Sequence, residues 1–323
     1  MFSTRGVRSG ESMNPSQPRL TIGITTRNRS ESLRTCVDSL RHVRHLDPEI
    51  LVFDDASEIP AAEILKSHQQ VRIIRDNGSP GNIVGRNVLM KAARADTVLL
   101  LDDDAALLNG ESIERAMRII QSDRQVGAVA FAQANIDGTP WPEEMQPGRG
   151  KAPRYVPAFI GFAHLLNRAV FLDLGGYRES FVFYGEEKEY CLRLLDRGYQ
   201  VVYLPDALVV HAQDAAGRTP QRYLRYVTRN DCLHALYNEP IWRAMWLVPA
   251  RLALYFRMRS RWGIDDPLGP RWILAELAAN GGAALRSRRP VSRQTRASWR
   301  RLRDGSAPYP PAGLVPVPAG NAD

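Results

Sequence analysis

The pattern of hydrophobic and polar residues alternates between β-prone runs and helical spacing over the first 100 residues. The expected strands cover residues 20–25, 49–53, 71–75 and 98–102, and the expected helices cover residues 30–43, 59–67 and 81–93. Strands that alternate with helices through short connections predict a parallel sheet built from right-handed crossover units. The sequence therefore indicates an α/β fold, with helices on the faces of a mostly parallel sheet.

Polar residues end three of these expected strands. Thr25 and Arg27 lie at the end of the first strand, Asp54 at the end of the second, and Asp102–Asp104 at the end of the fourth. The carboxyl ends of parallel strands share one edge, where ligands bind. Three adjacent carboxylates repel one another, and hard oxygen ligands suit Mg²⁺ or Mn²⁺ bridged to substrate phosphates. A solvated acidic turn is the alternative, but the neighbouring polar strand ends favour a metal site.

The second half of the chain carries weaker patterns and changes character near residue 218. Extended segments are expected at 128–132, 200–203 and 208–211, a loop at 138–157, and a helix at 187–197. Beyond Pro220 the pattern is helical and rich in Arg. The predicted division is a disordered leader (1–18), an α/β domain (19–217), a basic helical extension (218–303) and a disordered tail (304–323).

Charge is unevenly distributed along the chain. The 323 residues carry a net charge of +8, yet residues 218–303 hold 18 Arg, no Lys and five acids, a net +13 that leaves −5 for the rest. Such a basic region predicts an anionic partner. Arg alternates there with Trp242, Trp246, Phe256 and other aromatic residues, which favours an anionic membrane surface. The alternatives are a solvated helical subdomain with these aromatics in its core, and nucleic-acid binding, which no recognition motif supports.

The location predicted for the protein is cytoplasmic and peripheral on the cytoplasmic face of the membrane. Three scattered cysteines show no metal-type spacing and indicate a reducing compartment. The first 18 residues lack the apolar core of a signal peptide. No run reaches the roughly 18 apolar residues that a membrane-spanning helix needs.

Several residues outside the acidic triplet are candidates for chemistry. Glu187 would begin a helix and share its apolar face with Tyr190 and Leu194, while Glu189 would point elsewhere; a carboxylate at the edge of a core can serve as a general base. The alternative is an acid favoured there by the helix dipole. His211 follows an apolar run, where it could be a metal ligand or a structural histidine. Arg86 could bind a phosphate or a carboxylate such as Asp54, or form a surface salt bridge.

Seven motifs in order resemble family 2 glycosyltransferases of the GT-A fold. They are Thr25-Thr26-Arg27-Asn28-Arg29, Val52-Phe53-Asp54-Asp55-Ala56-Ser57, Gly85-Arg86-Asn87, Leu101-Asp102-Asp103-Asp104, Gly175-Gly176-Tyr177, Tyr184-Gly185-Glu186-Glu187, and Pro205-Asp206-Ala207 with His211. The resemblance covers residues 20–238. It implies a Rossmann-like GT-A domain that transfers a sugar from a nucleotide-diphosphate sugar to a hydroxyl acceptor, with inversion and with Mg²⁺ or Mn²⁺.

The resemblance also implies a role for each matching residue. Donor binding falls to Thr25, Arg27, Asp54, Arg86, Asp102 and Asp103; metal binding to Asp104, Asp102 and His211; catalysis to Glu187 as the base; and the acceptor side to Tyr184 and Glu186. Two positions depart from the family pattern, since the base is usually Asp and the position of Arg27 is often aromatic. The membrane contact predicted for the basic region would suit a cell-envelope or lipid-linked glycan as the acceptor. The alternatives are a nucleotidyltransferase, or a non-catalytic relative that binds nucleotide sugars or nucleic acid.

Overall fold

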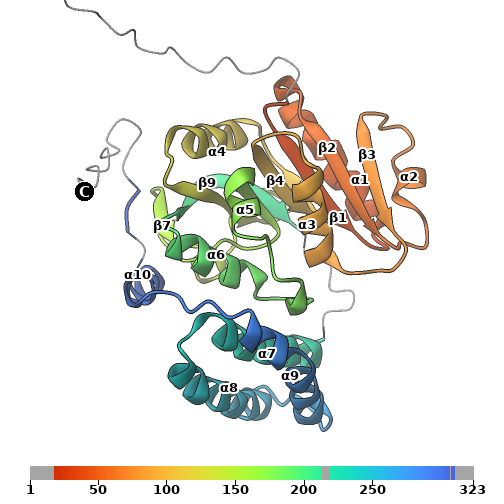
Figure 1. The fold of residues 1–323 in the computed structure, drawn as a ribbon. Coiled ribbons are helices and arrows are strands. Elements are labelled where there is room, and N and C mark those ends of the chain that lie inside the picture. Colours follow the sequence, from red (N-terminus) through yellow and green to blue (C-terminus); the bar gives the residue numbers. More distant parts are fainter. Residues whose placement is uncertain (1–17, 213–218, 306, 310–323) are drawn as a thin grey trace, which may run out of the picture.

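The computed structural model describes residues 18–212, 219–305 and 307–309, and a mixed sheet forms its centre (Figure 1). The strands of these residues run in the order β3-β2-β1-β4-β8-β6-β9-β5, and β7 pairs with β9. They are β1 (Thr21–Thr26), β2 (Glu49–Asp55), β3 (Val71–Asp76), β4 (Thr97–Asp102), β5 (Ala105–Leu107), β6 (Val126–Ala134), β7 (Arg154–Val156), β8 (Ala163–Asn167) and β9 (Gln200–His211). The predicted α/β class is confirmed.

The first four strands in this order form the parallel part of the sheet. In its register Thr25 lies opposite Asp102, and Thr26 lies opposite Asp54, so the carboxyl ends of β1, β2 and β4 meet at one edge as predicted. Every residue of β1 is buried, and the centre of β4 is a buried apolar run, as is typical of strands covered on both faces. Beyond β4, strand β8 is antiparallel to both β4 and β6, whereas β6 and β9 pair in parallel.

Helices cover both faces of the sheet. Apolar residues of α1 (Ser30–Ser39), α2 (Ala61–Ile64) and α4 (Glu111–Ser122) form one core with the sheet, together with the 3₁₀ segment η1 (Leu40–Leu46). Residues of α3 (Asn82–Ala92), α5 (Arg168–Asp173) and α6 (Glu186–Asp196) form the core on the other face. Two further 3₁₀ turns are η2 (Glu143–Met145) and η3 (Glu179–Phe181).

The C-terminal part of the chain adds four helices. They are α7 (Pro220–Asn238), α8 (Ile241–Arg261), α9 (Gly269–Arg286) and α10 (Arg293–Asp304). Both α8 and α9 pack on α7, and these three form a group at the lower end of the molecule in Figure 1. Helix α10 returns to α6 and β7, and Trp299 packs against the core there. Among the described residues, no helix combines the length and apolar character that crossing a membrane requires.

Three local expectations differ from the structure. The helix expected over 59–67 is only the four-residue α2. The chain before it forms a turn in which the backbone N–H groups of Ser57 and Ala61 donate to Asp54. The segments expected at 200–203 and 208–211 are one strand, β9, with a register shift against β6. The tail was expected to be disordered from residue 304, but its first part is hydrogen-bonded to the domain. The backbone N–H of Tyr155 donates to the carbonyl of Ala307, and that of Tyr309 donates to the carbonyl of Pro153. Residues 1–17 and 310–323 lie outside the described residues.

Candidate active site

Arg86 of α3 joins the carboxyl end of β4 to the start of α6. Its Nη2 donates to Asp102 Oδ1 at 2.6 Å and to the carbonyl of Gly161 at 2.9 Å, and its Nη1 donates to Glu186 Oε1 at 2.8 Å. The side chain is only 2% exposed. Burial alone would lower the pKa of Arg86, but the carboxylates of Asp102, Glu186 and Glu187 outweigh it and raise the pKa, so the guanidinium stays charged.

Glu187 extends beside this guanidinium and against the backbone of Gly161. A Cβ atom built on Gly161 would lie 2.2 Å from Glu187 Oε1 and 3.1 Å from both terminal nitrogens of Arg86. Burial raises the pKa of Glu187 although Arg86 opposes the shift, and it raises the pKa of Glu186, with the neighbouring charge of Glu187 adding to the effect. Two carboxylates therefore share one buried cation, and Glu187 is the type of group that can accept a proton.

The loop before α6 is conformationally strained and is held from α7. Val182, Tyr184 and Gly185 have φ angles of 61°, 66° and 84°, a region that β-branched and aromatic residues rarely adopt. Nδ2 of Asn230 donates to the carbonyls of Phe181, Phe183 and Tyr184 at 2.7–2.9 Å. Backbone strain of this kind persists only where surrounding contacts fix it, and it is frequent at functional sites. The C-terminal helices thus help to position the catalytic candidates.

The acidic triplet is not a set of equivalent carboxylates. Asp103 is buried; its Oδ2 accepts from Thr26 at 2.8 Å, and its Oδ1 accepts from Arg29 at 3.0 Å. Burial raises the pKa of Asp103 to about 6. Arg29 also lies 3.4 Å from Asp104 Oδ2. Asp102 is the most exposed of the three, with 23% of its side chain accessible, and it faces Arg86.

His211, at the end of β9, faces Asp104. The imidazole is stacked between Phe162 and Trp141, with ring centroids 4.7 and 5.3 Å away. Its Nδ1 lies 2.7 Å from Gln133 Oε1. A carboxamide oxygen only accepts, so Nδ1 carries a proton, and Nε2 lies 3.8 Å from Asp104 Oδ1.

These two side chains fit a divalent cation bound in part by the substrate. Within residues 18–212, 219–305 and 307–309, no three His, Cys, Asp or Glu side chains cluster as a complete metal site. Asp104 and His211 are nevertheless near enough for one ion to contact both, and carboxylate and imidazole are both ligands for Mn²⁺. Mg²⁺ and similar ions commonly use one or two protein ligands together with substrate phosphates.

The end of β2 carries two buried aspartates, Asp54 and Asp55. Asp54 is fully buried; it accepts the backbone N–H groups of Ser57 and Ala61 at 2.9 Å, and Arg75 at 2.5 Å. Burial alone would raise the pKa of Asp54, but these hydrogen bonds outweigh it and lower the pKa. Arg75, and not Arg86, is therefore the arginine that binds Asp54. Three donors thus hold Asp54 behind the sheet edge, and its contact with a nucleotide base stays a prediction.

Arg27 lies at the exposed end of this sheet edge, beside Asp55. The Arg27 side chain is 56% exposed, and its Nη1 lies 3.8 Å from Asp55 Oδ2. Thr25 is buried, and it lies opposite Asp102 in the register of β1 with β4. Tyr184, on the acceptor side of the prediction, is half-buried and packs edge-on against Tyr223 of α7 at 5.1 Å. Glu186, also predicted for the acceptor side, is buried and bound to Arg86.

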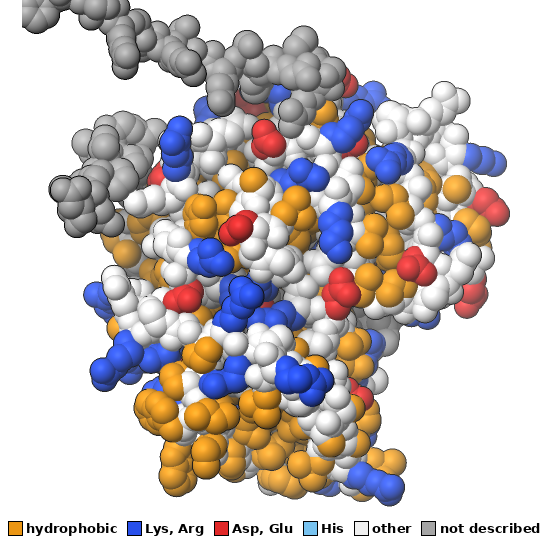
Figure 2. Space-filling model, viewed as in Figure 1, with side chains coloured by type: hydrophobic (Ala, Val, Ile, Leu, Met, Phe, Trp, Pro, Cys, Tyr) orange, Lys and Arg blue, Asp and Glu red, His pale blue; other side chains and the backbone are white. Residues whose placement is uncertain are grey.

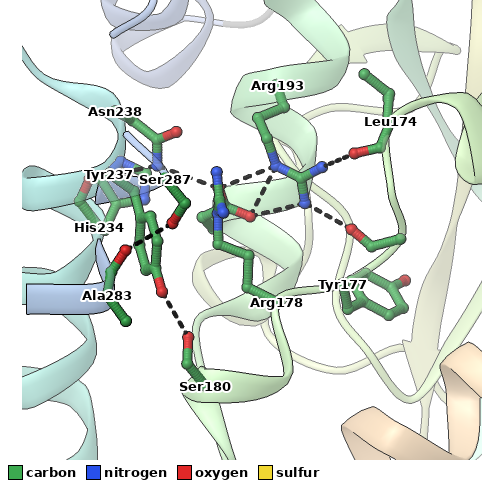
Figure 3. A network of polar contacts seen from close by, with 12 residues as sticks. Leu174, Tyr177, Arg178, Ser180, Arg193, His234, Tyr237, Asn238, Ala283 and Ser287 are labelled. Carbon is green, nitrogen blue, oxygen red and sulfur yellow. Dashed lines mark hydrogen bonds and ion pairs between the residues drawn. The ribbon is translucent and has the colours of Figure 1, made fainter. Parts of the chain in front are cut away.

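A buried ionic network behind the site was missed from the sequence. Glu189, expected to point away from the core, is fully buried and accepts from Arg178 at 2.7 Å and from Arg193 at 2.8 Å. Figure 3 shows Arg178 and Arg193 side by side between the loop at Leu174 and the end of α7. Arg193 also donates to the carbonyls of Leu174 and Gly176. The spacing of Glu189 and Arg193, four residues apart on one helix, was the available signal.

Comparisons with known proteins agree with this geometry. Residues 21–175 match the family model described as glycosyl transferase family 2. A pre-mycofactocin glycosyltransferase of Mycobacterium tuberculosis is 26% identical over 221 residues, which cover 61% of this chain and 43% of that protein. The chain thus spans less than half the length of this relative.

Solved structures share the fold at lower identity. S. aureus TarS (residues 1–349, in complex with UDP-GlcNAc) superposes with a TM-score of 0.59 and 15% identity, over 88% of this chain and 87% of that one. A mannosyltransferase from Pyrobaculum calidifontis, in complex with GDP-Man and Mn²⁺, gives a TM-score of 0.55 and 18% identity, over 90% and 85% of the two chains. The family match identifies residues 21–175 as a glycosyl transferase family 2 domain, and the shared architecture shows that the chain has the GT-A fold.

Proposed function

We propose that the protein transfers a sugar from a nucleotide-diphosphate sugar to a hydroxyl group of a glycan acceptor, with inversion at the anomeric carbon. One observation carries this proposal: Arg86 binds Asp102 on the donor side and lies against Glu187 on the other side. A carboxylate for the donor and a carboxylate for the acceptor proton thus lie beside one guanidinium. Single displacement places the acceptor hydroxyl and its base on one side of the anomeric carbon and the leaving diphosphate on the other, so the base must lie close to the donor.

The donor would lie along the edge formed by β1, β2 and β4. Arg27 and Asp55 border the opening where the nucleotide base would enter, and the guanidinium of Arg27 can stack on a base. Asp102, the accessible member of the triplet, suits the ribose hydroxyls. Asp103 is engaged by Thr26 and Arg29, which favours an indirect role in shaping this edge.

Asp104 and His211 would hold the divalent cation. When bound, this ion offsets the negative charge that builds on the leaving nucleoside diphosphate. Two structural neighbours, one solved with GDP-Man and Mn²⁺ and one with UDP-GlcNAc, support a metal and a nucleotide-sugar donor.

Glu187 would act as the base in the chemical step. Its carboxylate takes the proton of the acceptor hydroxyl while that oxygen attacks the anomeric carbon, and the bond from that carbon to the diphosphate oxygen breaks. The nucleoside diphosphate leaves on the opposite side, so the anomeric configuration inverts. Arg86 keeps its charge throughout and fixes the position of both reacting sides.

A donor screen tests the proposal directly. Purified protein is incubated with UDP-, GDP- and dTDP-sugars in Mn²⁺ or Mg²⁺, and binding and slow hydrolysis to the free sugar are measured. We expect one nucleotide class to bind and to be hydrolysed, with EDTA and Asp104→Asn each lowering hydrolysis at least about tenfold. Asp206→Asn, in an exposed part of β9, is the matched control. Absence of binding to every nucleotide sugar would contradict the proposal and favour a non-catalytic relative.

A further inference from the structure

We propose that α8, the turn after it and α9 form a docking face for an anionic lipid bilayer. We further infer that the acceptor is a glycan anchored in that bilayer; this second part rests on the proposed function. The argument uses the exposure of the apolar side chains, the charges around them, and a line of aromatic rings that leads to the catalytic loop.

One side of α8 is apolar and exposed to solvent. The large side chains on it are Ile241 (48% exposed), Trp242 (61%), Met245 (69%), Trp246 (78%) and Phe256 (53%). Pro249 and Ala253 are also exposed and continue the same face, because residues four apart lie above one another on a helix. Figure 2 shows hydrophobic side chains gathered at the lower end of the molecule, where α8 lies.

The neighbouring segments extend this apolar surface. Trp262 and Leu268 in the turn after α8 are 48% and 65% exposed, and Leu274 of α9 is 56% exposed. The exposed residues of α9 between Arg271 and Arg286 are small or apolar. So many large exposed apolar side chains in one part of the chain are unusual for a soluble monomer and mark a contact site.

The charges around the face favour an anionic bilayer as its occupant. Helix α8 contains five Arg and no Asp or Glu, and Arg257 and Arg261 border the exposed face. In α9 the single acid, Glu276, is paired with Arg229. A second copy of this chain on the same face would bring these arginines together, whereas anionic headgroups would neutralise them. Exposed Trp side chains also favour the headgroup region of a bilayer.

Aromatic rings connect the docking face to the catalytic loop. The ring of Trp262 lies 6.4 Å from Tyr223 of α7, and Tyr223 lies 5.1 Å from Tyr184, which precedes Glu186 and Glu187 by two and three residues. Tyr223 is 42% exposed. A cavity of about 370 Å³ lined by Trp262, Gly263 and Pro220 opens beside this line. An amphiphilic acceptor anchored below would meet aromatic side chains as far as Tyr184, in the loop that leads to the base.

The docking face is tested by vesicle binding. Full-length protein is sedimented with vesicles of phosphatidylcholine alone and with vesicles containing 30 mol% phosphatidylglycerol, at low and high salt. We expect binding to the anionic vesicles, weaker at high salt. The variant Trp242→Glu/Trp246→Glu should bind about tenfold or more weakly while donor hydrolysis is unchanged.

Two controls complete the vesicle experiment. Ile136→Glu introduces a charge at a side chain that is 83% exposed on the catalytic domain, and it should bind like the wild type. The proposal is overturned if the wild type fails to bind anionic vesicles at low salt, or if the double variant binds as well as the wild type. A dimer in solution that the double variant abolishes would also overturn it, by assigning the face to a second copy.

The anchored acceptor is tested with paired glycosides. Donor consumption is measured with methyl glycosides of common hexoses and with the matching dodecyl glycosides embedded in the anionic vesicles. We expect at least about tenfold stimulation by one dodecyl glycoside over its methyl form, lost in the double variant. If no dodecyl glycoside stimulates more than its methyl form, the anchored acceptor is contradicted. Donor binding and slow hydrolysis are measured in the same samples and report on the proposed function separately.

Discussion

Gly161 lies where the side chains of Arg86 and Glu187 meet, and Gly161→Ala should displace the base without removing it. The added Cβ would lie 2.2 Å from Glu187 Oε1, whereas real Cβ contacts do not fall below 3.0 Å, so this oxygen must move by at least about 0.8 Å. The two contacts to Arg86, at 3.1 Å, need an adjustment of only a few tenths of an ångström. A misplacement of about 1 Å in a reacting group can cost about 10²-fold in rate.

The expected result is a loss of turnover with little loss of binding. Donor hydrolysis by Gly161→Ala should fall about 10²-fold, whereas the Kd for the nucleotide sugar, measured by calorimetry, should stay within about threefold. The moving atom is the end of a flexible side chain, so the fold should survive, which thermal melting checks. Gly282→Ala is the matched control, because its Cβ would meet only the end of Arg286 at an ordinary 3.5 Å. Wild-type hydrolysis by Gly161→Ala would refute the placement of the base.

Three further predictions follow from the surroundings of the site. Burial raises the pKa of Glu187, and the base works deprotonated, so kcat/KM for donor consumption should fall on the acid side with an apparent pKa above 4.5; a limb at or below 4.5 would contradict this. Glu189→Gln should lower the free energy of unfolding by about 3–5 kcal/mol in urea, because Arg178 and Arg193 lose their buried carboxylate; an unchanged midpoint would contradict the network. Gln133→Ala should raise the Mn²⁺ concentration needed for hydrolysis about 10- to 100-fold, because this carboxamide orients the imidazole; an unchanged requirement would argue against a metal there.

The Glu189 network also adds an acid-sensitive component to stability. Burial alone would raise the pKa of Glu189, but the charges of Arg193 and Arg178 outweigh it and lower the pKa. A carboxyl group whose pKa is lowered by folding stabilises the native state above its unfolded pKa of about 4.5, and this contribution is lost as the pH falls through the folded value. The difference between the wild type and Glu189→Gln should therefore be smaller in acid than at neutral pH.

The sheet edge could be predicted from the sequence because it depends on local patterns. The run of Val98 to Leu101 is apolar on both faces, and the residues after it must leave the sheet at the carboxyl edge. The same reasoning placed Thr25 and Asp54 at this edge, and the register of β1 with its neighbours confirms it.

The partners of individual carboxylates could not be predicted in this way. Asp54 binds Arg75, its partner in the register of β2 with β3, and Asp103 binds Arg29; the first pair depends on strand register and the second on loop conformation, and hydrophobic periodicity encodes neither. Glu189 was placed outward because Glu187 was expected on the apolar face of the helix, but Arg178, eleven residues earlier, makes the burial of Glu189 possible. The contact of Gly161 with Glu187 joins distant segments and leaves no local signal.

The most direct measurement compares Glu187→Gln with the wild type for donor binding and donor hydrolysis in the same sample. The substitution keeps the size of the side chain beside Gly161 and Arg86 but removes its ability to take a proton. The account predicts a Kd for the nucleotide sugar within about threefold of the wild type and hydrolysis lowered by about 10²-fold or more. Glu187→Asp, which restores a carboxylate, should recover part of the rate. Hydrolysis by Glu187→Gln close to the wild-type rate would contradict the assignment of Glu187 as the base.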